Sequence, residues 1–262
     1  MTGYHWQRYT FAQRMWRYLA YLATVAVMFW AVSDLDIYWP WVKDAPVQIA
    51  DLLGRMSPPK LDDLRQIGSA LIETVHIATI ATLLALVLAV PTAYIAARNT
   101  TSNQVLLWLG RFIVVSTRSV NTIIWALLFV AIFGPGVVAG ILAIAFRSIG
   151  FVGKLMAEAI EEIDRRQVEA IQATGAGPAK VVLYGIVPQV LPAFFAVAVL
   201  RWDINIREST VLGLVGAGGI GLILQSAIDL FDWRTVATVL IAILGIVILG
   251  ELVSAALRRR VL

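Results

Sequence analysis

The feature that most constrains this chain is a series of apolar blocks, each about as long as a lipid bilayer is thick. A transmembrane helix needs roughly 20 mostly apolar residues to cross the hydrocarbon layer. Six such blocks cover about residues 18–32, 70–97, 106–133, 137–156, 181–202 and 235–257. Of the 262 residues, 60% are hydrophobic and only 15% are charged, against roughly a quarter charged in soluble proteins. We therefore predict an all-α membrane protein with about six transmembrane helices.

The first apolar block also has features of a secretory signal peptide. Three arginines precede it, and residues 31–33 resemble the small-residue pattern of a cleavage site. Because Phe29 and Trp30 are bulky for a cleavage region, we favour a retained membrane anchor. The proline- and aspartate-rich stretch that follows is too polar to cross the hydrocarbon layer, and we expect an external loop. We therefore divide the chain into residues 1–69, an N-terminal anchor helix and external loop, and residues 70–262, a core transmembrane domain.

The distribution of basic residues predicts the orientation of the chain. Of the 21 Lys and Arg residues, twelve fall on the side of the N-terminus and the terminal arginine triplet, six fall on the other side, and three lie within apolar blocks. Cytoplasmic loops carry the excess of Lys and Arg in membrane proteins. We therefore expect a multi-pass protein of the bacterial plasma membrane with both termini in the cytoplasm. This topology also accounts for the net charge of +4 without a nucleic-acid partner.

Residues that would support catalysis or metal binding are scarce. The chain has no cysteine and two histidines, His5 and His76, which have no ligand-type neighbours in the sequence. We find no phosphate-binding lysine loop and no Ser/His/Asp arrangement, so we expect no catalytic residue, metal or cofactor. Residues 216–221 formally match the dinucleotide-binding pattern G-x-G-x-x-G. That pattern has meaning between a strand and a helix, and its position between two apolar blocks leads us to reject it.

Arginines occur at mid-depth in the predicted membrane spans. Arg118 lies in the third block and Arg147 in the fourth, and an isolated arginine at the bilayer centre costs roughly 3 kcal/mol or more. Each must therefore face a cavity or a partner. Several arginines with few carboxylates suit an anion, because guanidinium pairs well with phosphorus oxyanions. As candidate substrate-pathway residues we name Arg118, Ser119, Asn121, Arg147, Asn205, Arg207, Glu208, Gly218 and Gly219.

Structural alternatives stay open for part of this set. An internal ion-pair network that stabilises a helix break explains the charges between Arg201 and Glu208 equally well. Helix packing alone explains the glycine-rich residues 212–221, because small residues let backbones approach closely. The glycine-rich segment would otherwise line or gate the substrate path.

The largest segment predicted to be cytoplasmic, about residues 158–182, contains a sequence motif that begins at Glu169. From Glu169 it reads Glu-Ala-Ile-Gln-Ala-Thr-Gly, with Pro188 further on. This resembles the EAA loop of ABC importer permeases. Glu169, Ala170, Gly175 and Pro188 match that loop at the right spacing, whereas positions 171, 185 and 187 depart from it. Small alanines on a short helix fit a groove on a partner, and a glycine turns the chain sharply.

What this loop does follows from the resemblance. In such permeases the loop is a coupling helix that docks into the ATPase subunit, which implies that Glu169, Ala170 and Gly175 couple this chain to an ATPase. An ordinary amphipathic loop helix is the plainer alternative. The position of the loop between the fourth and fifth predicted spans, on the basic side, favours coupling.

A second motif runs from Arg201 to Gly221. It places Arg-Trp-Asp-Ile-Asn-Ile-Arg before Val-Gly-Ala-Gly-Gly-Ile-Gly and resembles the signature of phosphonate-type permeases. The resemblance covers about residues 70–260, and Asn121 departs from it where the family has proline. It implies the fold of a type I ABC importer permease with a MetI-like core. It also implies transport of phosphonate, phosphite, hypophosphite or phosphate-like oxyanions, driven by ATP hydrolysis on partner subunits.

The resemblance further implies a set of partners. These are a second permease copy, identical or related, two ATP-binding subunits, and a periplasmic or lipid-anchored substrate-binding protein, with membrane lipids around the whole. Three rivals stay open: an ABC permease for another solute such as an amino acid, an ion-coupled secondary transporter, and a membrane enzyme. A secondary transporter should carry carboxylates in the middle of its spans, and an enzyme should carry a catalytic constellation. Neither feature is evident in this sequence.

Overall fold

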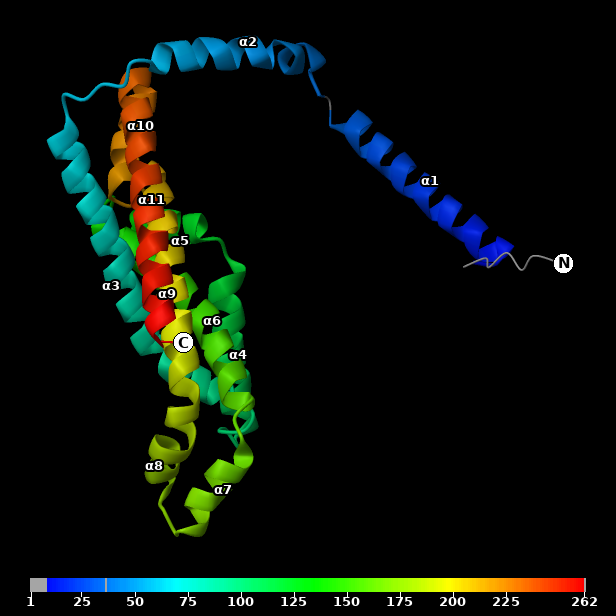
Figure 1. Ribbon diagram of the computed structural model, residues 1–262, viewed down its shortest axis with the longest axis vertical. Coiled ribbons are helices and arrows are strands. Elements are labelled where there is room, and N and C mark those ends of the chain that lie inside the picture. The colour runs from blue at the N-terminus through cyan, green and yellow to red at the C-terminus, as the bar shows by residue number, and fades with distance from the viewer. Residues whose placement is uncertain (1–8, 36, 262) are drawn as a thin grey trace. The chain divides into compact units, whose positions relative to one another are not determined.

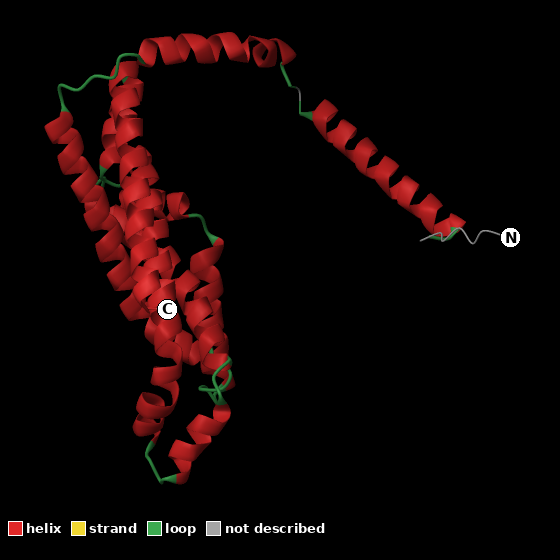
Figure 2. Cartoon of the chain, in the orientation of Figure 1, coloured by secondary structure: helices red, strands yellow, loops and turns green. Residues whose placement is uncertain are grey.

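The structure, a computed structural model, describes residues 9–35 and 37–261. Every regular element in these residues is a helix (Figures 1 and 2). The chain forms two compact units that divide between Gly54 and Arg55, and each is described by itself.

The first unit consists of a long helix and most of a second one. Helix α1 spans Phe11–Asp34, and its N-terminus is capped by Thr10 and Gln13 in a reciprocal arrangement of side chain and backbone. Helix α2 spans Trp39–Met56 and contains Pro46. The stretch that we predicted as an external loop thus contains an 18-residue helix. Of these two helices, α1 is long and apolar enough to cross a membrane.

The second unit is a bundle of helices built around α6 (Figure 1). Helix α6 packs against α3, α4, α5 and α9, and α11 packs against α9. A five-residue π-helical turn precedes α9, and a short 3-10 turn follows it. The elements in chain order are α3 Leu64–Ala96, α4 Gln104–Ser119, α5 Thr122–Phe133, α6 Val137–Glu161, α7 Arg165–Ala173, α8 Pro178–Val181, η1 Val182–Ile186, α9 Val187–Leu212, η2 Gly213–Val215, α10 Ile220–Asp229 and α11 Trp233–Val261.

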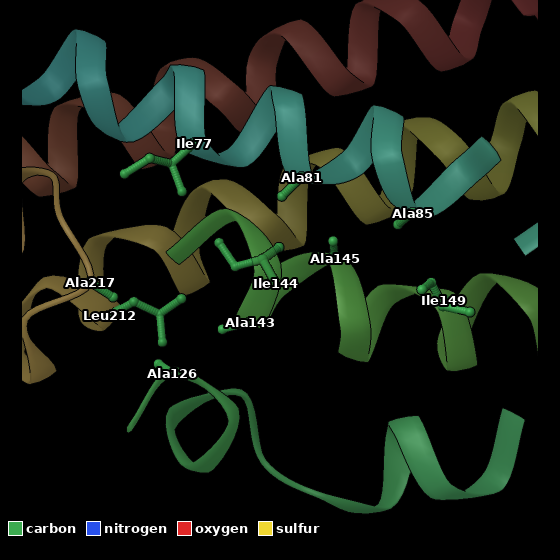
Figure 3. Packing of buried hydrophobic residues seen from close by; sticks show 10 residues of the cluster. All are labelled: Ile77, Ala81, Ala85, Ala126, Ala143, Ile144, Ala145, Ile149, Leu212 and Ala217. Carbon is green, nitrogen blue, oxygen red and sulfur yellow. The ribbon is translucent and has the colours of Figure 1, made fainter. Parts of the chain in front are cut away.

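The centre of the bundle is filled largely by small side chains. Buried alanines of α3 and α6 meet there with a few isoleucines, as Figure 3 shows. Gly150 on α6 lies so close to α4 that an added Cβ would stand 2.6 Å from the carbonyl oxygen of Val114. Lipid tails are as apolar as the side chains, so helices in a membrane associate through close packing rather than through a hydrophobic driving force. Alanine and glycine are the residues that allow this approach.

The outer surface of the bundle carries many large apolar side chains. Leu83, Val87, Leu244 and Leu252 are more than half exposed. An apolar surface of this extent on a soluble protein would drive association, whereas hydrocarbon solvates it well. Among the described residues, five helices are long and apolar enough to span a membrane, or six if one bent helix pair forms a single span. The predicted all-α membrane fold with about six spans is confirmed.

That bent pair corrects the expectation for the third apolar block. We predicted one continuous span over residues 106–133, but α4 and α5 meet at an angle of 92°. Two successive residues with extended backbone, Val120 and Asn121, interrupt the helix. The Asn121 side chain caps α5 by accepting from the amide of Ile123 (3.1 Å), and the indole of Trp125 donates to the carbonyl of Thr117 in α4 (3.3 Å). These side chains therefore hydrogen-bond to two of the backbone groups that lose their helical partners at the break.

At the opposite end of α3 from the α4 connection, hydrogen bonds tie the entry to α3 to the start of α11. Arg234 donates to the carbonyl of Pro58 (2.8 Å), and Thr238 donates to the carbonyl of Lys60 (2.6 Å). Asp232 accepts from the hydroxyl of Thr235 (2.7 Å) and from its amide (3.2 Å). These bonds, with a smaller contribution from Lys60, lower the pKa of Asp232. The contacts fix the two long helices that flank α9.

Candidate functional site

Two arginines share one carboxylate inside the bundle. Arg147 comes from α6, and Arg201 and Glu208 come from α9. Arg147 Nη1 lies 3.3 Å from Glu208 Oε1, and Arg201 Nη2 lies 3.3 Å from Glu208 Oε2. The side chains are 33%, 2% and 18% exposed for Arg147, Arg201 and Glu208, respectively. Because one carboxylate cannot neutralise two guanidinium groups, this arginine pair with Glu208 carries one net positive charge.

Neutral polar side chains complete the hydrogen bonding of this cluster. Thr122, the first residue of α5, accepts from Arg147 Nη1 (2.8 Å) and donates to Glu208 Oε2 (2.7 Å). Ser148 accepts from Arg201 Nε (2.8 Å). Groups buried in a low dielectric are costly unless they are paired in this way. We call the set of Thr122, Arg147, Ser148, Arg201 and Glu208 the arginine cluster.

Asn205 links the arginine cluster to α3. Its amide nitrogen donates to Thr82 Oγ1 (2.7 Å), and its amide oxygen lies 3.3 Å from Ser148 Oγ. Asn205 and Ser148 are both fully buried. The polar network therefore joins α3, α5, α6 and α9 at one level of the bundle.

The structure thus brings three of the predicted pathway residues together, namely Arg147, Asn205 and Glu208. It adds Arg201, Ser148, Thr122 and Thr82, which the sequence did not single out as pathway residues. A signal for Arg201 was present, because residues four and seven positions apart share one face of a helix, which groups Arg201 with Asn205 and Glu208. For Thr122 and Thr82 we find no sequence signal.

The other predicted pathway side chains lie outside this network. Arg207 pairs with Asp203 (2.5 Å) and is 45% exposed. Arg118, Ser119 and Asn121 are exposed beside the α4–α5 break. Arg118 has no ion-pair partner among the described residues. It lines a cavity of about 380 Å³ whose other charged residues are Arg111, Lys154, Glu158 and Glu161.

Gly218 and Gly219 are buried against α3. Both have positive φ, +87° and +75°, which favours glycine. The amide of Gly219 donates to Glu73 Oε1 (2.9 Å), and the amide of Ile220 donates to Thr74 Oγ1 (2.9 Å). Side chains of α3 thereby satisfy amides that the start of α10 would otherwise leave unpaired. The glycine-rich segment forms a tight break that is docked on α3.

At one end of the bundle α7 and α8 form an exposed hairpin (Figure 1). Gly175 follows α7 with φ +76°, and its amide donates to the carbonyl of Gln172 (2.9 Å). Pro178 then begins α8. The predicted coupling residues Glu169, Ala170 and Gly175 are all exposed on this hairpin. The hairpin thus presents Ala170 and Gly175 on a surface that no other described part of the chain covers.

Hydrogen bonds of Gln189 link the start of the hairpin to α9. Asp164 caps α7 through the amide of Arg166 (2.9 Å). Gln189, near the start of α9, accepts from the amide of Asp164 (2.9 Å) and donates to the carbonyl of Gly185 (2.6 Å). Sequence reasoning missed this role of Gln189. The hairpin is therefore attached to the same helix that carries Arg201 and Glu208.

The bundle thus combines several membrane-length helices with an internal charged cluster and an exposed hairpin at one end. These are features of a membrane transport subunit. Residues 89–262 match the family described as binding-protein-dependent transport system inner membrane component. The chain belongs to this family. It is the membrane-spanning permease component of an ABC importer, as predicted, and is a multi-pass membrane protein. The family distinguishes it from ion-coupled secondary transporters.

Curated relatives agree with this family, and a solved structure shares the fold. The chain is 38% identical over 248 residues to the phosphite transport system permease protein PtxC of Stutzerimonas stutzeri, covering 93% of this chain and 90% of that protein. It is 42% identical to the phosphate-import permease protein PhnE of Mycolicibacterium smegmatis, covering 82% of this chain and 41% of that protein. An inward-facing structure of the MetNI methionine ABC transporter has the same fold, with a TM-score of 0.67, 22% identity, and coverage of 78% of this chain and 100% of that chain.

The burial of Arg201 generates a testable prediction. Arg201→Leu removes donors from Ser148 and Glu208, and unsatisfied buried groups of this kind should lower the free energy of unfolding by about 3 kcal/mol. Arg118→Leu removes an exposed arginine without a described partner and should leave stability nearly unchanged. Thermal unfolding of the two detergent-solubilised variants checks this. Equal melting temperatures would contradict a structural role for the buried ion pairs.

Proposed function

We propose that this chain is the permease of an importer for phosphorus oxyanions, such as phosphonate, phosphite, hypophosphite or phosphate. The arginine cluster is the observation that carries the proposal. Its two guanidinium groups exceed its one carboxylate, and guanidinium matches phosphorus oxyanions in geometry and charge. The names of the relatives PtxC and PhnE, which refer to phosphite and phosphate, support the same substrate class.

An amino-acid substrate fits the cluster less well. A zwitterion brings an ammonium group, which needs an acceptor such as a carboxylate. The carboxylate of the cluster, Glu208, is already contacted by Arg147, Arg201 and Thr122. The surplus positive charge therefore favours an anion over a zwitterion.

The substrate pathway is proposed to run along the face that carries the α4–α5 break. Arg147 is partly exposed, and Arg118, Ser119 and Asn121 are exposed at the α4–α5 break, directly before Thr122 of the arginine cluster. An arginine within a span does not face lipid without a large cost. This face is therefore expected to border a second permease copy, with the pathway between the copies. The cavity at Arg118, with three cationic and two acidic side chains, would continue that pathway.

The exposed hairpin is proposed to dock into an ATP-binding subunit through Glu169, Ala170 and Gly175. Gln189 would then transmit movement of the hairpin to α9 and hence to the arginine cluster. In the complete importer two such permease copies stand with two ATP-binding subunits on the cytoplasmic side and a substrate-binding protein on the other side. The excess of basic residues on the side of the hairpin supports this orientation, with both termini cytoplasmic. ATP hydrolysis takes place on the partner subunits.

Transport by the reconstituted importer tests the proposed substrate. Proteoliposomes with this permease, its ATP-binding subunit and its binding protein should take up labelled phosphite only when ATP is supplied. Arg147→Gln removes a charged donor in the pathway and should lower uptake by about tenfold or more. Arg17→Gln, which removes one arginine from α1, is the matched control and should transport at the wild-type rate. Absence of ATP-dependent uptake of phosphite, hypophosphite, phosphate and a phosphonate by the wild-type complex, or uptake driven by a proton gradient alone, would refute the proposal.

Coupling is tested by a substitution in the hairpin. At Gly175 the positive φ is strained for any L side chain and most of all for a branched one. Gly175→Val, alone or with Glu169→Ala, should therefore abolish uptake while basal ATP hydrolysis continues without stimulation by the loaded binding protein. Gly177→Ala is the control, because Gly177 has φ −66° and open space around its Cβ position. Normal uptake by the Gly175→Val variant would remove the hairpin from the coupling route.

A further inference from the structure

Glu208 occupies the place in the arginine cluster where an oxyanion would bind. Its two oxygens receive three donors, with Oε1 contacting Arg147 and Oε2 contacting Arg201 and Thr122. A phosphorus oxyanion offers the same kind of acceptor, with several oxygens around one centre. The donor set of the proposed substrate site is thus already filled by an anion that belongs to the protein.

The two arginines lie equally far from Glu208 but differ in burial. Arg201 is 2% exposed and is fixed from its other side by Ser148 (2.8 Å). Both contacts with Glu208 are 3.3 Å long, beyond the 2.7–2.9 Å of a strong charge-assisted bond, but Arg147 is 33% exposed and therefore open to a second anion. The contact between Arg147 and Glu208 is therefore the one that an incoming anion can exchange. Arg201 would keep the carboxylate in the cluster while this happens.

Thr122 is the third donor to Glu208 and lies where the chain turns from α4 into α5. It is the first residue of α5, directly after the 92° break that follows α4. Its hydroxyl bridges Arg147 and Glu208, at 2.8 and 2.7 Å respectively. Exchange of Glu208 for another anion at Arg147 would therefore involve Thr122 as well, and with it the start of α5.

We propose that Glu208 is a tethered competitor for the transported anion. It pairs with both arginines in the empty permease, and a phosphorus oxyanion displaces it from Arg147 and Thr122. Two consequences follow. Neither arginine is left unpaired, which would be costly in the membrane, and the substrate is held weakly enough to leave, as conduction requires. This inference rests on the proposed function and assigns Glu208 to the regulation of affinity at that same site.

Glu208→Gln provides the direct test, with equilibrium binding of labelled phosphite to the detergent-solubilised permease–ATPase complex as the measurement. Removal of the competing charge should tighten phosphite binding by about tenfold or more. Maximal uptake in proteoliposomes should fall, because release becomes slow. Asp203→Asn is the matched control, because Asp203 is a carboxylate of the same helix that pairs with Arg207 rather than with the cluster. Its phosphite affinity should equal that of the wild type.

A second variant tests the same inference if Glu208→Gln does not fold. Glu208→Asp keeps the charge but shortens the side chain, which withdraws it from Arg147 and should also tighten phosphite binding, though less. Wild-type affinity in a folded Glu208→Gln or Glu208→Asp variant would overturn the inference and leave Glu208 as a structural clamp. That outcome is distinct from failure of the proposed function, in which the wild-type complex itself takes up none of the four phosphorus oxyanions with ATP.

Discussion

A guanidinium group buried between transmembrane helices must be paired, and the pairing of Arg147 and Arg201 with Glu208 governs how the helices of this permease meet. Arg201 is almost fully buried and reaches α6 through Ser148, while Thr122 brings the start of α5 to the same carboxylate. Lipid cannot satisfy any of these groups. The helices that contribute them are therefore held at one level. The surplus positive charge of the two arginines stays inside the bundle, at the proposed substrate site.

Small side chains make this arrangement of helices sterically feasible. Alanines between α3 and α6 and the close approach of Gly150 to α4 bring backbones near enough for short polar side chains to reach across. Helix α9 connects the arginine cluster to the end of the bundle that carries the α7–α8 hairpin. Helix α9 carries Arg201 and Glu208 in its second half and Gln189, which binds the cap residue of α7, near its start. A movement of the hairpin would thus act on the helix that holds the carboxylate.

Much of the fold could be predicted from the sequence, because apolar blocks of bilayer length leave few options other than membrane helices. The exposed hairpin was predictable as well, since Gly175 and the small residues before it mark a turn. The break at Asn121 was not, because an asparagine caps a helix only when the tertiary structure turns the chain there. Which of Arg201 and Arg207 joins the arginine cluster also depends on packing. Each arginine has a carboxylate at helical spacing, so the sequence does not distinguish them. Gly218 and Gly219 dock on Glu73 and Thr74, residues far away in the sequence.

The central claim is that the arginine cluster receives the transported anion. A cryo-electron microscopy structure of the complete importer with bound phosphite tests it most directly. We predict an anion within hydrogen-bonding distance of Arg147 and Thr122, with the Glu208 carboxylate displaced from Arg147 and still paired with Arg201. An anion bound elsewhere along the pathway, with the contact between Arg147 and Glu208 intact, would contradict the account.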